Sequence, residues 1–265
     1  MKTVTFLLIF FTLAACAEQP GLMTAPVPSP TRPAEPLTSE TEITQSAGIE
    51  TVPVSPLDVQ IQLEDGLTIS GTFHPAGGEP PWPAILLLHM LGGNRGQWDK
   101  LVPELTSSGY AVLAIDLRGH GETGGEADWE KTKSDIPQVL NYLYKLPYIA
   151  SERVALAGAS IGANLSLAAA ANQTEIPTIV LLSPGLDYRG VTTLDALEKY
   201  GGRPLLLAAS SEDAYAADST RALAENASGE AELLIYDGAG HGTQMLEHAP
   251  GLPAAILTWL DRFLK

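Results

Sequence analysis

Six short, uninterrupted apolar runs follow residue 83, and they constrain the fold of this chain more than any other feature. An apolar run without alternation predicts a strand that is covered on both faces, as in a parallel sheet. Stretches with a helical pattern separate the runs, so consecutive strands are joined by crossover connections. The predicted strands are residues 84–88, 111–115, 154–157, 178–182, 204–208 and 231–236. We therefore expect an α/β fold with a mostly parallel central sheet and helices on both faces.

An antiparallel hairpin is predicted before the first buried strand. Residues 57–63 and 67–73 alternate apolar and polar side chains, which is typical of strands with one solvated face. Asp65-Gly66 between them favours a tight turn, because glycine adopts a positive φ readily. The connecting helices are predicted around residues 98–108, 131–146, 161–171, 193–200, 216–227 and 244–264. Together these elements form one predicted domain over residues 57–265.

The N-terminal 16 residues have the pattern of a signal peptide. The apolar run after Lys2 ends at Ala15 and is shorter than the ~20 residues that a membrane-spanning helix needs. Leu13-Ala14-Ala15-Cys16 resembles the lipobox of bacterial lipoproteins, in which the cysteine becomes the lipid-modified first residue. The resemblance implies lipidation of Cys16 and a membrane anchor in the bacterial cell envelope. A plain secretory signal, leading to a secreted or periplasmic protein, is the alternative.

Residues 17–56 are rich in proline, serine, threonine and glutamate, with almost no aromatic side chain. This composition excludes a helix or a central strand and predicts a disordered tether. The formal net charge of −16 argues against nucleic acid as a partner. Because Cys16 is the only cysteine, the domain must be stabilised by its core without an intrachain disulfide.

Polar and glycine-rich segments follow the predicted strands, where ligands bind in parallel sheets. Gly158-x-Ser160-x-Gly162 comes directly after the strand at 154–157 and opens an alanine-rich helix. This spacing matches a nucleophile elbow, in which a serine sits on a strained turn between strand and helix. Side chains at the two flanking positions would collide with the neighbouring strand and helix, so glycines are expected there.

The order of these segments resembles that of the α/β hydrolases. The segment 116–121 (Asp-Leu-Arg-Gly-His-Gly), the elbow, an acid after the fifth buried run and the terminal Gly240-His241-Gly242 occur in that family's order. The resemblance covers about residues 57–265 and points to esterases and dienelactone hydrolases without a large lid. It implies that His89 supports the oxyanion loop and that His120 holds neighbouring turns.

A serine–histidine–acid triad follows from this order. Ser160 is the predicted nucleophile, and His241 is the predicted base that takes its proton. Asp213 is the predicted acid that fixes the tautomer of His241, with Glu212 and Asp187 as alternatives. His248 is an alternative base, and His74 lies outside the expected crevice.

Two backbone N–H groups are needed to bind the developing oxyanion. Ile161 follows the nucleophile and should supply one of them. Leu91 should supply the other, although Met90 stands where most relatives have glycine and is the alternative donor. The histidines are scattered, and neither a metal site nor a nucleotide-binding motif is predicted, so no cofactor is expected.

The segment 184–192 is short, which predicts an open site without a lid. Tyr188 and Arg189 are expected at its rim, while Trp98 and Trp129 are expected to be packing residues. We therefore expect a serine hydrolase that cleaves carboxylic esters or thioesters of small or accessible acyl groups. The alternatives are a peptidase like the catalytic domain of prolyl oligopeptidases, and a non-catalytic envelope scaffold. The oligomeric state is left open.

Overall fold

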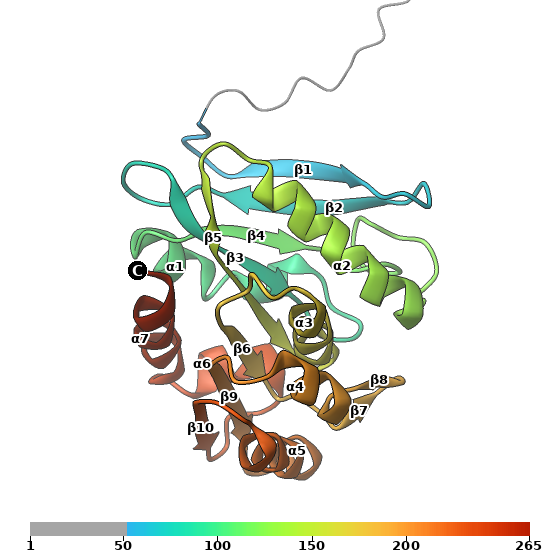
Figure 1. Cartoon of the computed structure of the whole chain (residues 1–265), viewed down its shortest axis with the longest axis vertical. Coiled ribbons are helices and arrows are strands. Elements are labelled where there is room, and N and C mark those ends of the chain that lie inside the picture. The colour runs from blue at the N-terminus through green and yellow to red at the C-terminus, as the bar shows by residue number, and fades with distance from the viewer. Residues whose placement is uncertain (1–51) are drawn as a thin grey trace, which may run out of the picture. The chain divides into compact units, whose positions relative to one another are not determined.

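The computed structural model describes residues 52–265 (Figure 1). The predicted signal segment with Cys16, and the predicted tether as far as residue 51, lie outside the described residues. The lipid anchor and the tether therefore stay predictions. In the described part of the chain, no helix combines the length and the apolar character that crossing a bilayer requires.

Among residues 52–265, eight strands form one sheet in the order β1-β2-β4-β3-β5-β6-β9-β10. Every pair from β4 to β10 is parallel, whereas β1 and β2 are antiparallel to each other and β2 is antiparallel to β4. The predicted hairpin and the mostly parallel sheet are thus confirmed. The strands are β1 (Leu57–Gln62), β2 (Thr68–His74), β3 (Trp82–Leu88), β4 (Ala111–Ile115), β5 (Ile149–Ala159), β6 (Ile179–Leu182), β9 (Leu205–Ser210) and β10 (Ala231–Tyr236).

Helices cover both faces of the sheet, because the central strands are apolar on both sides. Leu86 and Leu88 pack into one core with the helices α2 (Trp129–Tyr144), α3 (Ile161–Asn172) and α4 (Leu194–Tyr200). Ile85 and Leu87 point to the other face and pack with α1 (Val102–Ser107) and α7 (Leu252–Leu264). The remaining elements are α5 (Ala214–Asn226), α6 (Met245–His248), η1 (Arg95–Trp98), η2 (Gly242–Gln244) and the short strands β7 (Asp187–Tyr188) and β8 (Val191–Thr192).

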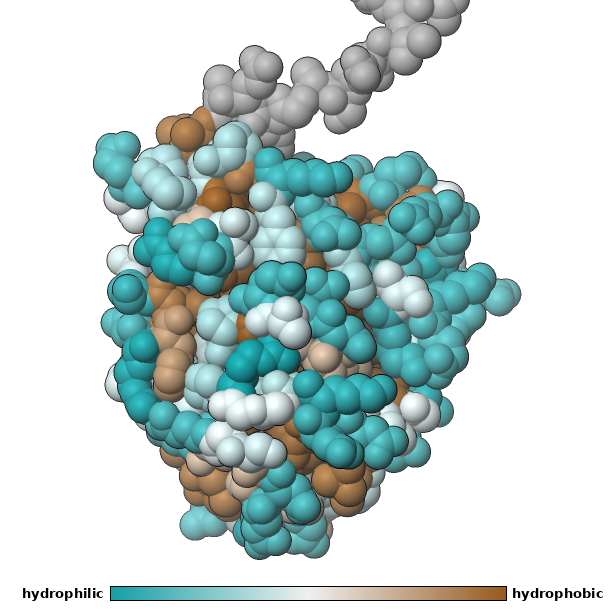
Figure 2. All heavy atoms as spheres, in the orientation of Figure 1, coloured by the Kyte–Doolittle hydropathy of each residue, from teal (hydrophilic) through white to brown (hydrophobic). Residues whose placement is uncertain are grey.

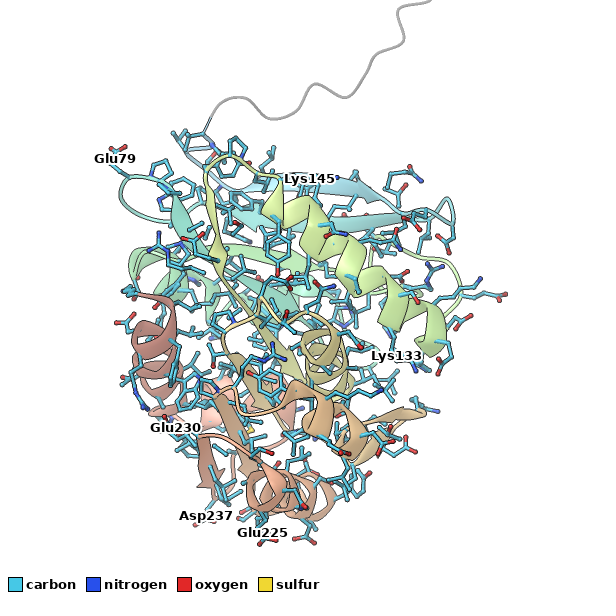
Figure 3. The ribbon with its side chains drawn as sticks, in the orientation of Figure 1. Glu79, Lys133, Lys145, Glu225, Glu230 and Asp237 are labelled. Atoms are coloured by element: carbon cyan, nitrogen blue, oxygen red, sulfur yellow. The ribbon has the colours of Figure 1, made fainter. Side chains whose placement is uncertain are left out.

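The helix α2 presents a polar face to solvent and an apolar stripe to the sheet. Figure 2 shows hydrophilic residues over the region of α2, and Lys133 and Lys145 lie towards its two ends in Figure 3. One charged residue, Asp135, is on the buried side of α2 and is 2% exposed. Its carboxylate receives two hydrogen bonds, of 2.8 and 2.7 Å, from the buried guanidinium of Arg118. This ion pair joins α2 to the loop after β4.

Two predicted helices are interrupted in the structure. The single helix predicted over 244–264 is wrong: η2 and α6 are separated from α7 by Ala249, Pro250 and Gly251. A proline has no N–H for a helical hydrogen bond, and its ring disfavours a helical conformation of the residue before it. The helix predicted over 98–108 is also shorter, because α1 begins one residue before Pro103 and Trp98 belongs to η1.

Candidate active site

Ser160 stands at the turn from β5 into α3 and has a backbone conformation that L residues rarely adopt. Its φ is 55° and its ψ is −121°. Such a conformation costs on the order of 1–3 kcal/mol and persists only where the surroundings impose it. The backbone N–H of Ser160 donates to the carbonyl of Leu182 on β6 at 2.8 Å, which pins the turn to the sheet. Ser160 is 7% exposed.

The two glycines of the elbow are required for space. A Cβ at Gly158 would lie 2.1 Å from the carbonyl oxygen of Gly162 in α3. A Cβ at Gly162 would lie 2.2 Å from the carbonyl oxygen of Leu88 at the end of β3. The helix and both strands therefore approach one another only because these positions lack side chains.

His241 lies in the loop after β10, and its Nδ1 is hydrogen-bonded to the carboxylate of Asp213. Asp213 follows β9, immediately before α5. Glu230 and Asp237, labelled in Figure 3, stand just before and just after β10, and the Asp237 end is the edge at which the His241 loop begins. With Asp213 on Nδ1, the Nε2 atom of the imidazole is the one left to act on a serine.

The other two candidate acids make different contacts. Glu212 accepts hydrogen bonds from Ser210 Oγ at 2.6 Å and from the N–H of Gly238 at 2.6 Å. These two bonds lower the pKa of Glu212 to about 2. Asp187 accepts from the N–H of Gly190 in its own hairpin. The contact with His241 is therefore made by Asp213 rather than by Glu212 or Asp187.

Several side chains that the sequence did not single out hold the His241 loop. Ser183, at the end of β6, accepts a hydrogen bond from the N–H of Gly242 at 2.8 Å. Gln244 accepts one from the N–H of His241 at 3.0 Å. Gly242 has a φ of 57°, and a Cβ there would lie 2.3 Å from the sulfur of Met90. The loop after β3 and the loop after β10 thus pack directly against each other.

The loop after β3, which carries both predicted oxyanion donors, is organised by His89, which is completely buried. Its Nε2 accepts from the N–H of Leu117 at 2.9 Å, and its Nδ1 donates to the carbonyl of Met90 at 2.7 Å. The N–H of Met90 donates to Gln97 Oε1 at 3.0 Å, so this alternative oxyanion donor is already engaged. Among residues 52–265, no acceptor pairs with the N–H of Leu91 or of Ile161.

Burial of His89 predicts a pH dependence of stability. Desolvation lowers the pKa of His89 from 6.5 to about 4, so the unfolded chain binds the proton more readily than the folded one. The contribution of neutral His89 to the free energy of unfolding is therefore fully present above pH 6.5, and it is lost as the pH falls towards 4. Between pH 7 and pH 4.5, His89 should lower the free energy of unfolding by about 2 kcal/mol. Urea unfolding of the protein and of His89→Gln across this range measures the contribution.

His74, whose pKa is also lowered by burial, acts in the same direction and remains in both proteins. The free energy of unfolding is plotted against pH for both proteins, and the difference between the two slopes isolates the contribution of His89. If His89→Gln has the same slope as the unaltered protein, the buried neutral imidazole is not the cause.

The other sequence candidates lie at several places. The ring of His120 packs between those of His89 and Trp129, with centroids 5.1 and 5.7 Å apart. Trp98 is fully buried in the core beside α1 and α7. Arg189 is exposed in the turn between β7 and β8, and His248 ends α6. None of these residues contacts Ser160 or His241 through a hydrogen bond within residues 52–265.

A polar cavity of about 340 Å³ lies apart from the predicted triad. Arg95 crosses it and bonds Asp116 at 2.5 Å and Glu122 at 2.6 Å. Asp116 also accepts from the N–H groups of Arg95 and Glu122. These charges are already paired with one another, and the bonds hold the loop after β4 against the loop after β3. Within the described residues, no group of three or more acidic, histidine or cysteine side chains is arranged to hold a metal.

Tyr188 is the common neighbour of the three predicted triad residues. Its ring lies edge-on to that of His241, with centroids 6.3 Å apart and an interplanar angle of 85°. Burial raises the pKa of Tyr188 to about 12, the charge of Asp213 adds to this effect, and the nearby Ser160 side chain opposes it. Tyr188 therefore lies beside His241 at the carboxyl edge of the sheet, with Ser160 and Asp213 near enough to affect its pKa.

Comparison with known proteins agrees with this architecture. The family described as "alpha/beta hydrolase fold" matches residues 83–197. An esterase of Pyrococcus furiosus superposes with a TM-score of 0.69 at 20% identity, covering 80% of this chain and 92% of the esterase. The chain has the α/β-hydrolase fold. Its segment between β6 and α4 carries only the short hairpin β7–β8, and the predicted architecture is confirmed.

The matches to relatives found by sequence cover a smaller part of the chain. The quorum-quenching protein AidA of Acinetobacter baumannii is 29% identical over 144 residues, which are 52% of this chain and 47% of AidA. The esterase FrsA of Serratia proteamaculans is 30% identical over 115 residues, 42% of this chain and 27% of FrsA. The chain spans about half the length of the first curated relatives it matches.

Proposed function

We propose that this protein is a serine hydrolase that cleaves carboxylic esters or thioesters through an acyl-enzyme on Ser160. The observation that carries the proposal is the hydrogen bond between Asp213 and Nδ1 of His241, at the edge of the sheet where Ser160 occupies the strained turn between β5 and α3. A serine hydroxyl is a weak nucleophile and needs an adjacent base whose orientation is fixed. The esterases among the similar proteins support the same reaction class.

In this reaction, the Oγ of Ser160 attacks the carbonyl carbon while its proton passes to Nε2 of His241. The oxyanion of the tetrahedral intermediate accepts hydrogen bonds from the N–H groups of Ile161 and Leu91. When the bond to the leaving group breaks, His241 returns the proton to the departing oxygen or sulfur. A water, deprotonated by His241, then attacks the acyl-enzyme and releases the acid and Ser160.

We propose small or solvent-accessible acyl groups as substrates. The site is bordered by the short hairpin β7–β8, and two apolar side chains near it are exposed to solvent. These are Leu91, with 45% of its surface exposed, and Tyr215, with 50% exposed. An open rim with a few apolar side chains suits an acyl chain that extends into solvent better than a long fatty chain that must be buried.

A fluorophosphonate probe tests the proposed function directly, because it reacts with a serine only when a base activates that serine. We expect the folded protein to take up the probe on the peptide that contains Ser160, and to hydrolyse p-nitrophenyl acetate. Heat-unfolded protein and Ser160→Ala should take up none, whereas the exposed Ser151→Ala should label like the unaltered protein. Mass spectrometry of the labelled peptide locates the site.

The proposal is wrong if the folded protein neither takes up the probe nor turns over any short ester or thioester. It is also wrong if the probe or the activity survives unchanged in Ser160→Ala.

A further inference from the structure

Tyr188 belongs to a tight hairpin that begins five residues after β6. Asp187 pairs with Thr192 and Tyr188 with Val191. The turn consists of Arg189 and Gly190, both with positive φ, at 56° and 82°. A two-residue turn of this kind matches the twist of the strands it joins. The hairpin is therefore a defined element.

The hairpin is fixed to the same helix that carries Ser160. Asn164, fully buried in α3, donates to the carbonyl of Val191 at 2.7 Å and accepts from the N–H of Gly185 at 3.0 Å. Thr193 Oγ1 donates to the carbonyl of Gly185 at 2.9 Å. Both ends of the hairpin are thus bonded to the elbow helix or to each other, so Tyr188 and Ser160 are held in one framework.

The ring of Tyr188 is held by its neighbours, whereas its hydroxyl is available. A Cβ at Gly185 would lie 2.7 Å from the ring, so the ring packs closely on that glycine. Tyr215 stands edge-on to it at 5.6 Å, and the Tyr215 hydroxyl is itself bonded to the backbone N–H and carbonyl of Asp187 at 2.9 and 3.0 Å. Within residues 52–265, no protein group is hydrogen-bonded to the Tyr188 hydroxyl, and Ser160 is close enough to affect its pKa.

The order of the strands tells on which side of Ser160 this hydroxyl lies. The neighbours of β5 in the sheet are β3 on one side and β6 on the other. Leu91, the predicted oxyanion donor, follows β3, whereas Tyr188 follows β6 and contacts His241. The oxyanion and the leaving group point in different directions from the carbonyl carbon, and His241 must reach the leaving group. Tyr188 is therefore on the leaving-group side.

We propose that the Tyr188 hydroxyl donates a hydrogen bond to the leaving-group oxygen of the ester attached to Ser160. This inference rests on the proposed function. In the tetrahedral intermediate the bond from carbon to the alkoxy oxygen lengthens, and charge develops on that oxygen. The proton that completes the alcohol comes from His241, and Tyr188 keeps its own proton. Its hydrogen bond strengthens as the charge grows, which is the condition for lowering the barrier.

The phenol is suited to this role by its protonation. Burial keeps the pKa of Tyr188 near 12, so the group is neutral and carries its proton throughout the neutral range. A donor in this place matters most when the alcohol is a poor leaving group. A nitrophenol leaves readily without help, whereas an alkoxide does not.

The test is Tyr188→Phe, which keeps the ring and removes only the hydroxyl. We expect kcat/KM for ethyl acetate to fall roughly 10- to 100-fold, the range of one hydrogen bond to a charged group. We expect kcat/KM for p-nitrophenyl acetate to fall less than about 3-fold, because a nitrophenol leaves readily without a hydrogen-bond donor. The two substrates share the acyl group, so the comparison reports on the leaving group alone. A series of acetates of alcohols with different pKa values should show a steeper dependence on leaving-group pKa in Tyr188→Phe than in the unaltered protein.

Tyr215→Phe is the matched control, since it removes a hydroxyl from the same aromatic pair but one that bonds only the backbone of Asp187. It should change both substrates by the same factor. Equal losses, or no loss, on both substrates in Tyr188→Phe would overturn the inference. A failure of the proposed function is distinguishable, because the unaltered protein would then neither hydrolyse these esters nor take up the fluorophosphonate probe.

Discussion

The Asp213→Asn variant is expected to lose about 10⁴-fold in kcat for ester hydrolysis, with its fold intact. The Asp213 carboxylate accepts a hydrogen bond from the Nδ1–H of His241, which leaves Nε2 free to take the proton of Ser160 in the proposed reaction. An asparagine amide can instead donate to Nδ1 and thereby place the proton on Nε2, where it blocks the base. Steady-state kinetics on p-nitrophenyl acetate, together with circular dichroism and thermal unfolding, measure the loss and check the fold.

Glu212→Gln is the matched control, because Glu212 is the adjacent carboxylate on the same turn. Its bonds to Ser210 and to the N–H of Gly238 hold the loop that leads to His241. A glutamine keeps an acceptor for Gly238, so the loss in kcat should stay below about 10-fold. If Glu212→Gln is the crippled variant and Asp213→Asn the active one, the triad has been assigned to the wrong acid.

Replacing Arg118 with alanine is expected to lower the free energy of unfolding by about 3–5 kcal/mol. The guanidinium donates two hydrogen bonds to Asp135, and the two side chains are 8% and 3% exposed. Alanine would leave a buried carboxylate on α2 without its main partner. The resulting loss is a large part of the stability of a typical domain. Denaturant unfolding at neutral pH measures it.

Two further variants separate the ion pair from simple loss of packing. Arg118→Met combined with Asp135→Leu removes both buried charges and should recover much of the loss, because the one remaining partner of Arg118, Asp65, is exposed to solvent. Lys133→Ala breaks the exposed pair with Glu130 on the same helix and should cost less than about 1 kcal/mol. Equal losses for Arg118→Ala and for the double variant would show that the charge of Asp135 is not the cause.

The sheet could be predicted from the sequence because each central strand is a run of apolar residues between breakers. The strand predicted at 111–115 and the strand predicted at 231–236 have the bounds of β4 and β10. The single helix predicted over 244–264 was wrong, and the signal for the break, Pro250-Gly251, was present in the sequence. Its apolar period continues across the break, because α6 and α7 pack into the same core. The apolar periodicity thus indicates which residues share a core, whereas the proline indicates where the helix is interrupted.

The finer structure of the candidate site depends on contacts between segments far apart in the sequence. Asp213 and Glu212 are neighbours after the same strand, and only the capture of Glu212 by Ser210 and Gly238 separates their environments. Met90 and Leu91 are distinguished in the same way, because Gln97 takes the N–H of Met90. A pattern along the chain carries no information on these pairings, so it leaves Glu212 and Asp187 as alternatives to Asp213, and Met90 as the alternative to Leu91.

The hairpin β7–β8 has a consequence for how proteins of this architecture diversify. Its Arg189-Gly190 turn faces solvent, while Asn164 on α3 holds its base with two hydrogen bonds. A longer segment inserted at that turn would extend near Ser160, the proposed nucleophile, and leave the anchoring bonds at the base undisturbed. An insertion at this one turn could therefore narrow the range of substrates without moving the proposed triad.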